Sequence, residues 1–258
     1  MGNFRNYSAI YDLLYRHKDY AAEADYVART VRSVCPHAVQ ILELGSGTGR
    51  HGRLLAQLGF RVHGIERSPE MVAMARAAPA EHGEAAGLFT CEVGDLCTIA
   101  LGRKFDAVVA LFHVVSYQAT DENLQAAFRT AADHLAEGGV FLFDVWHGPA
   151  VLAVRPAHRT KQIENERYRV TRTARPELDS ERRVVNVTYD FETVDRQSGE
   201  TSRFSEEHPM RYLFPTEIDA LARSCGLRRI LDEEFATGAR PSERTWGVVY
   251  MLQKAAPS

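Results

Sequence analysis

The stretch that decides the fold is residues 39–58, VQILELGSGTGRHGRLLAQL. Its first six residues are mostly apolar, which is typical of a buried strand. Gly45, Gly47 and Gly49 then interrupt the apolar run, and three leucines after them restart a helical period. The stretch therefore predicts a strand, a glycine loop and a helix in direct succession.

Strand and helix signals keep alternating as far as about residue 148. Residues 61–66, RVHGIE, indicate a second short strand, and Ser68 with Pro69 marks the next helix start as N-cap and first helical residue. Further strands are expected at 88–93, 105–112 and 139–145, with a helix at about 121–136. This alternation predicts an α/β fold with a doubly wound, mostly parallel sheet.

The pattern changes after Pro149, where apolar and polar residues alternate singly. About three antiparallel strands are expected there, separated by residues 176–179 and 195–199. A helix at 216–225, ended by Gly226, and two closing strands at 227–233 and 246–252 should follow. At the other end, two helices, or one broken near 16–19, are expected between about 8 and 34.

These elements divide the chain into four parts. We expect an N-terminal helical cap (1–37), a cofactor-binding core (38–148), an antiparallel β insertion (149–214), and a closing helix with the final strands of the core (215–258).

Composition and charge exclude several classes of protein. The 258 residues include 31 Lys and Arg against 34 Asp and Glu, which gives a net charge of −3. The protein therefore has no net positive charge to attract nucleic acid or an anionic membrane. No signal peptide and no run of 18 apolar residues is present, which predicts a cytoplasmic protein. The four cysteines and ten histidines lack zinc spacing, so no metal site is expected.

The glycine loop favours a nucleoside ligand over a dinucleotide. Glycines between a strand and a helix let a ligand approach the backbone closely. A dinucleotide fingerprint needs a third glycine at position 50, which is Arg50 here. Glu66, at the end of the second strand, could accept both hydroxyls of a ribose. Arg67 would clamp a 2′-phosphate under an NADP hypothesis, but the missing glycine weighs against it.

Asp95 and Leu96 follow the third strand, where the acid could accept a hydrogen bond from an adenine amino group and the leucine could pack on the ring. Taken together, five segments resemble the class I S-adenosylmethionine-dependent methyltransferases: 41–50, 64–68, 94–96, 105–109 and 135–142. The resemblance implies a seven-stranded sheet in which a late strand inserts antiparallel, and S-adenosylmethionine as cofactor.

The resemblance also implies which residues hold the cofactor. The loop would line its methionine part, Glu43 would lie near the methionine amino group, and Glu66 would bind the ribose. The full set of cofactor residues expected is Tyr20, Glu43, Gly45, Ser46, Gly47, Gly49, Glu66, Arg67, Asp95, Leu96 and Leu111.

Residues 11–23, YDLLYRHKDYAAE, are similar to the N-terminal segment of the sugar N-methyltransferases that act on nucleotide-linked 3-amino deoxysugars. This narrower likeness implies a small-molecule acceptor, a nucleotide-linked aminosugar, and a homodimer. O-methylation of a sugar or another small metabolite is the alternative. An NAD(P)-dependent reductase, disfavoured by the loop spacing, and a catalytically inactive cofactor-binding protein also remain open.

Two histidines at strand ends, His113 and His147, are the candidate catalytic residues. An acceptor that must lose a proton needs a base, and imidazole titrates near the working pH. His113 could equally be a packing wall beside the cofactor.

Aromatic residues are the candidates for holding the acceptor. Tyr11 shares a helix face with two other tyrosines, a stripe that fits either the core or a lid. Tyr11 or Tyr20 could hydrogen-bond the cofactor or the acceptor, and Tyr117 and Trp146 could stack on a sugar or a base.

Overall fold

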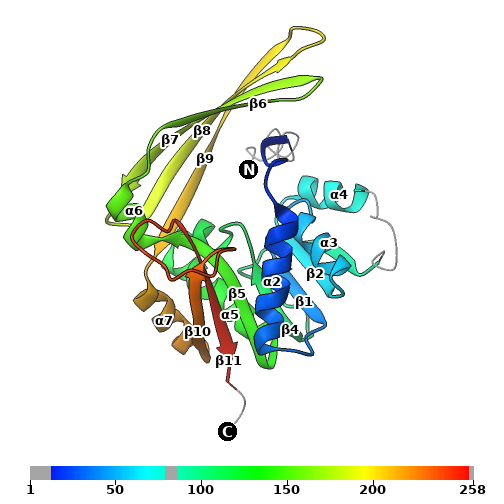
Figure 1. The fold of residues 1–258 in the computed structure, drawn as a ribbon, viewed down its shortest axis with the longest axis vertical. Helices are drawn as coiled ribbons and strands as arrows, with labels where there is room; N and C mark the ends of the chain where they lie inside the picture. Colours follow the sequence, from blue (N-terminus) through cyan, green and yellow to red (C-terminus); the bar gives the residue numbers. More distant parts are fainter. Residues whose placement is uncertain (1–12, 79–86, 256–258) are drawn as a thin grey trace.

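The computed structural model describes residues 13–78 and 87–255. Its core is a seven-stranded sheet in the order β3, β2, β1, β4, β5, β11, β10 (Figure 1). The strands are β1 (Gln40–Leu44), β2 (Arg61–Glu66), β3 (Phe89–Val93), β4 (Phe105–Ala110), β5 (Leu135–His147), β10 (Leu227–Glu234) and β11 (Gly247–Lys254). β1 to β5 pair in parallel, and β11 pairs antiparallel with β5 and β10. The predicted doubly wound sheet with a late antiparallel strand is confirmed.

Helices cover both faces of this sheet, because alternate residues of each strand point to opposite sides. α2 (Tyr20–Val34) and α3 (Arg50–Gln57) pack on the face that includes Ile41, and α4 (Pro69–Ala77) packs against β3. α5 (Asp121–His134) and α7 (Pro215–Ser224) cover the face that includes Leu42. The short elements are η1 (Val115–Tyr117) and α6 (Gly148–Val154).

Side-chain caps set the helix starts that the sequence indicated. Asp19 accepts the backbone N–H of Ala22 at 2.9 Å, so α2 begins at Tyr20, after the expected break. Ser68 accepts the N–H of Met71 at 3.2 Å, with Pro69 as the first helical residue of α4.

The predicted insertion is an antiparallel ribbon of β6 (Arg159–Glu164), β7 (Tyr168–Asp179), β8 (Val184–Asp195) and β9 (Thr201–Leu213). It leaves the core as a long curved ribbon (Figure 1). β9 pairs with the end of β5 at Trp146–Tyr212 and His147–Leu213, which joins the ribbon to the core sheet.

Two details of the insertion differ from the sequence expectation. It has four strands instead of about three, because β6 is almost wholly exposed and carries no apolar alternation. Residues 176–179 do not separate two strands but lie inside β7. Pro176 fits there because β6 pairs only as far as Ala174, so one side of β7 is an open edge that needs no N–H donor.

Candidate active site

The glycine loop has one open face. Gly45, Gly47 and Gly49 have φ of +70°, +55° and +74°, a left-handed conformation that favours glycine. A Cβ on Gly45 would lie 2.6 Å from Val114, and one on Gly49 would lie 2.6 Å from Phe89. A Cβ on Gly47 would meet nothing closer than a sulfur at 4.0 Å. The outer two glycines therefore permit close packing, and Gly47 lines open space.

Glu66, at the end of β2, holds the glycine loop by hydrogen bonds. Its carboxylate accepts the N–H of Gly47 at 3.0 Å and the N–H of Ser68 at 2.8 Å. The N–H groups of Gly45 and Ser46 donate to the carbonyl of Ile65 at 2.8 and 3.0 Å. The half-buried carboxylate thus sits beside the open face of the loop, whereas Arg67 is exposed to solvent.

Glu43 is a buried acid behind the same loop. Its side chain is 2% exposed, and Oε2 has no hydrogen-bond partner among the described residues. Burial raises the pKa of Glu43 to about 8, against the opposing effects of Arg53 and the Gly52 N–H, and nearby Glu66 adds to the rise. A buried, unsatisfied carboxylate oxygen is uncommon and suits a cationic ligand group.

Gly52 is a site residue that the sequence reading missed. A Cβ there would lie 2.6 Å from Oε2 of Glu43 and 2.3 Å from the Phe89 ring. The available signal was a glycine inside a predicted helix, where it is destabilising unless something must come close.

Residues after β3 complete this edge of the sheet. Gly94 donates its N–H to the Glu66 carbonyl at 3.0 Å, which brings Asp95 and Leu96 next to the end of β2. Asp95 accepts the Cys97 N–H at 2.8 Å, and Leu96 packs partly buried against the core. Leu111, another predicted cofactor residue, is 3% exposed within the core on the α2 side.

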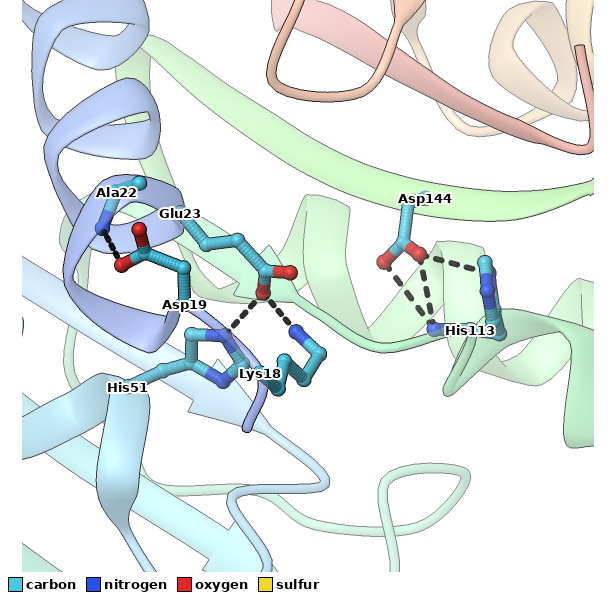
Figure 2. Close-up of polar contacts among 7 residues, drawn as sticks. All are labelled: Lys18, Asp19, Ala22, Glu23, His51, His113 and Asp144. Atoms are coloured by element: carbon cyan, nitrogen blue, oxygen red, sulfur yellow. Dashed lines mark hydrogen bonds and ion pairs between the residues drawn. The ribbon is translucent and has the colours of Figure 1, made fainter. Parts of the chain in front are cut away.

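A cluster of charged side chains links the N-terminal part of the chain to α3, the helix that follows the glycine loop. Glu23 forms ion pairs with Lys18 and with His51 of α3, whose Nε2 lies 2.8 Å from Oε2 of Glu23 (Figure 2). Burial would raise the pKa of Glu23, but His51 and Lys18 outweigh it and the pKa is lowered. The Lys18 ammonium lies 4.6 Å from the ring centroids of both Tyr20 and Phe112. Tyr20 is buried in this cluster, which the sequence reading did not identify, and its role in binding the cofactor stays a prediction.

His113 is held by a carboxylate from β5. The consecutive residues Phe112 and His113 both have positive φ, +67° and +63°, which is a strained arrangement for non-glycine residues. The His113 N–H donates to both oxygens of Asp144 at 3.1 Å. Nδ1 of the ring lies 2.7 Å from Oδ2, at ion-pair distance but not fully aligned for a hydrogen bond (Figure 2).

Asp144 carries its charge in spite of being 1% exposed. Burial would raise its pKa, but the His113 ring, the His113 N–H and Lys18 outweigh burial, so the pKa is lowered. With Nδ1 facing Asp144, Nε2 is on the other side of a ring that is 27% exposed. The signal for Asp144 was a lone acid in the apolar run 140–146, and sequence reasoning did not use it.

The structure does not bring His147 to His113. Alternation along β5 puts Asp144 and Trp146 on one face of the sheet and His147 on the other. His147 is 5% exposed, and its Nδ1 has no hydrogen-bond partner within residues 13–78 and 87–255. Burial lowers its pKa, with Asp232 acting in the opposite direction. A catalytic role for His147 stays a prediction.

Trp146 connects His113 to a surface cavity. Its ring lies 6.4 Å from the His113 ring and 5.6 Å, edge to face, from the Trp246 ring. The cavity, about 560 Å³, is lined by Ala153, Val154, Glu243, Arg244 and Trp246.

Tyr117 links the core to the ribbon. Its hydroxyl lies 2.8 Å from Nδ1 of His208 on β9, and burial raises the pKa of Tyr117 well above its usual value. Arg172 of β7 donates to the Tyr15 hydroxyl at 3.2 Å and stacks 4.8 Å from the Tyr189 ring. Tyr11 lies outside the described residues.

Residues 13–78 and 87–255 contain neither a membrane-spanning helix nor a metal centre. No helix there has the length and apolar character to cross a membrane. No group of three or more His, Cys, Asp or Glu side chains in these ranges could hold a metal ion.

Comparison with known proteins identifies the family of the chain. A family model described as a methyltransferase domain matches residues 41–139. The chain is 33% identical over 233 residues to the dTDP-3-amino-3,4,6-trideoxy-alpha-D-glucopyranose N,N-dimethyltransferase of Streptomyces venezuelae, covering 86% of this chain and 90% of that protein.

Solved structures give the same result. The structure of Streptomyces venezuelae DesVI has a TM-score of 0.78 at 28% identity, covering 98% of each chain. The sugar N-methyltransferase KedS8 from Streptoalloteichus has a TM-score of 0.78 at 28% identity, covering 95% of this chain and 92% of that one. A relative this similar along most of both chains settles the family, and the glycine loop with its two acids lies where the family model matches. The chain therefore belongs to the S-adenosylmethionine-dependent methyltransferases.

Proposed function

We propose that this protein transfers methyl groups from S-adenosylmethionine to the amino nitrogen of a nucleotide-linked aminosugar. The observation that carries the proposal is the match to an aminosugar N,N-dimethyltransferase along 86% of the chain. The residues of the site support it on the cofactor side and on the acceptor side.

The cofactor residues fit the charges and hydroxyls of S-adenosylmethionine. The unpartnered oxygen of Glu43 suits the amino group, the carboxylate of Glu66 suits the ribose hydroxyls, and the open face at Gly47 leaves room beside the loop. Asp95 and Leu96 would border the adenine. When bound, the cofactor supplies a methyl group already activated by a positively charged sulfur.

The acceptor side offers aromatic and cationic groups. Trp146, Trp246 and the cavity with Arg244 provide stacking surfaces and a charge for a nucleotide-linked sugar. An amino sugar is an ammonium ion at neutral pH and has no lone pair until it loses a proton. His113, whose Nδ1 lies 2.7 Å from Oδ2 of Asp144, would accept that proton.

O-methylation of a sugar is the second candidate function. The observation that favours it is again the buried Asp144 beside His113, because a hydroxyl acceptor needs a base even more than an ammonium does. The homodimer, the cytoplasmic location and the four-part division of the chain expected from the sequence stay predictions.

Thermal shift measurements test the proposal. S-adenosylhomocysteine should raise the melting temperature and NADPH should not, because only a ligand of the native state stabilises it. With S-adenosylhomocysteine present, a dTDP-linked aminosugar should add more stabilisation than its hydroxyl counterpart. Stabilisation by NADPH alone would contradict the cofactor side of the proposal, and equal shifts with both sugars would contradict the acceptor side.

Replacing Glu66 by alanine should weaken S-adenosylhomocysteine binding by about 1–3 kcal/mol, because a charge-assisted pair of hydrogen bonds to the ribose is lost. Titration calorimetry measures the change. Glu70→Ala, in the first turn of α4, is the matched control and should leave the affinity unchanged. Equal affinities for the wild type and a folded Glu66→Ala protein would remove Glu66 from the site.

Cofactor binding at pH 7 should release close to one proton from Glu43. With a pKa of about 8 the unliganded acid is mostly protonated, and a ligand ammonium beside it favours the charged form. Calorimetry in buffers of different ionisation enthalpy should show the release at pH 7. The release should be absent at pH 9 and in Glu43→Gln. Identical binding heats in all buffers would contradict the assignment.

The same group makes the stability of the unliganded protein depend on pH. The folded state keeps the Glu43 proton up to about pH 8, whereas the unfolded state loses it near 4.5. The free energy of unfolding should therefore fall as the pH rises through this window, and Glu43→Gln should flatten the fall. Urea unfolding at several pH values measures the free energy of unfolding. If this free energy falls equally steeply with pH in the wild type and in Glu43→Gln, the buried state of Glu43 is contradicted.

A further inference from the structure

Asp144 contacts His113 in two independent ways. Both carboxylate oxygens accept the His113 backbone N–H at 3.1 Å, which fixes the main chain of the turn. Oδ2 also lies 2.7 Å from Nδ1, which restricts the direction of the ring. One buried acid therefore controls both the backbone and the side chain of His113, the candidate base.

The turn itself needs such support. Phe112 and His113 are consecutive non-glycine residues at φ of +67° and +63°, and strain of this kind persists only where the surroundings determine it. The ring of Phe112 stacks 6.0 Å from the His113 ring. A relaxed turn would aim the imidazole elsewhere.

The His113 backbone N–H and the Lys18 ammonium help to keep Asp144 ionised when the imidazole is neutral. His113 faces it from the loop after β4, and Lys18 approaches from the N-terminal segment. A buried carboxylate that is ionised can only accept hydrogen bonds. In a neutral imidazole facing it, the favoured position for the proton is therefore Nδ1, and Nε2 keeps its lone pair.

We propose that Asp144 is a positioning residue: it holds His113 in the strained turn and keeps the ring proton on Nδ1, so that Nε2 takes the proton of the acceptor. The proposal deepens the proposed function and rests on it for the identity of the acceptor. The nitrogen of the acceptor passes its proton to Nε2 and keeps the electron pair that forms the new N–C bond. The methyl–sulfur bond of the cofactor would break as this bond forms, its electron pair would stay on sulfur, and S-adenosylhomocysteine would leave. The imidazolium that results is stabilised by the Asp144 charge.

Asp144→Asn is the decisive variant. An amide oxygen still accepts the His113 N–H, so the turn can persist, but the amide N–H would donate to Nδ1 and move the ring proton to Nε2. We expect kcat to fall about 10²–10⁴-fold, with KM for the acceptor and affinity for S-adenosylhomocysteine near wild type. The double variant with His113→Asn should be no slower than His113→Asn alone, because Asp144 acts through His113.

A matched control exists at the far side of the sheet. Glu92 of β3 lies 3.3 Å from Nε2 of His63, so Glu92→Gln makes the same acid-to-amide change beside a different histidine. This control should keep wild-type kcat.

The position of the ring proton can be measured by ¹⁵N NMR of protein labelled with ¹⁵N-histidine. This measurement needs neither cofactor nor acceptor. The neutral His113 ring should carry its proton on Nδ1 in the wild type and on Nε2 in Asp144→Asn. The wild-type spectrum alone is decisive if the variant does not fold, since a proton on Nε2 there would overturn the proposal.

Wild-type kcat in a folded Asp144→Asn protein, or additive losses in the double variant, would also overturn it. If the NMR shift occurs but no nucleotide-linked aminosugar is methylated, the proposed function fails while the positioning of His113 is supported.

Discussion

Replacing Gly47 by valine should abolish cofactor binding while the sheet stays folded. A Cβ at this position enters open space on the ligand side of the loop, and φ of +55° disfavours a β-branched residue. Titration calorimetry with S-adenosylhomocysteine, together with circular dichroism, measures both effects.

Gly102→Val is the control that separates the effect of backbone strain from the effect of a side chain that blocks the cofactor. Gly102 has a similar φ of +65°, and an added Cβ would meet nothing within 4 Å, but it lies outside the site. The control should share the backbone strain and keep wild-type affinity. Tight binding by a folded Gly47→Val protein would show that the loop is not the cofactor cradle.

Replacing His113 by alanine should lower kcat about 10²–10⁴-fold while S-adenosylhomocysteine affinity stays near wild type. The ring is the candidate proton acceptor, and the groups that it faces are Asp144, Phe112 and Trp146. Steady-state kinetics across pH, with separate cofactor titrations, measure the effect.

His113→Asn distinguishes proton transfer from simple positioning of the acceptor. Asparagine keeps a polar group but cannot take the proton. A rate near wild type at neutral pH would contradict the role of a base, and a loss mainly in KM would leave only positioning. A parallel collapse of cofactor binding would assign His113 to the cofactor wall instead.

The placement of the candidate cofactor residues could be predicted from sequence because its signals are local. The glycines, Glu43 and Glu66 are fixed by the ends of two adjacent strands, and that geometry follows from parallel strand order alone. The alternation of strands and helices likewise follows from short-range patterns. The function of each glycine did not follow, because only packing shows that Gly49 meets Phe89 while Gly47 faces open space.

The acceptor side depends on contacts between distant parts of the chain. His113 follows the end of β4 and Asp144 lies near the end of β5, so their meeting needs the register of β4 against β5. The cluster of Lys18, Glu23 and His51 needs α2 docked on α3. The strand β6 was missed because exposed polar residues leave no alternation to read.

The mass of the products tests the central claim most directly. A panel of nucleotide-linked aminosugars and their hydroxyl counterparts would be incubated with the protein and S-adenosylmethionine carrying a deuterated methyl group. We expect the mass of the amines alone to increase by one or two labelled methyl groups. Fragmentation of the products should locate these methyl groups on nitrogen. Labelled methyl groups on the hydroxyl compounds, with the amines unchanged, would contradict N-methylation.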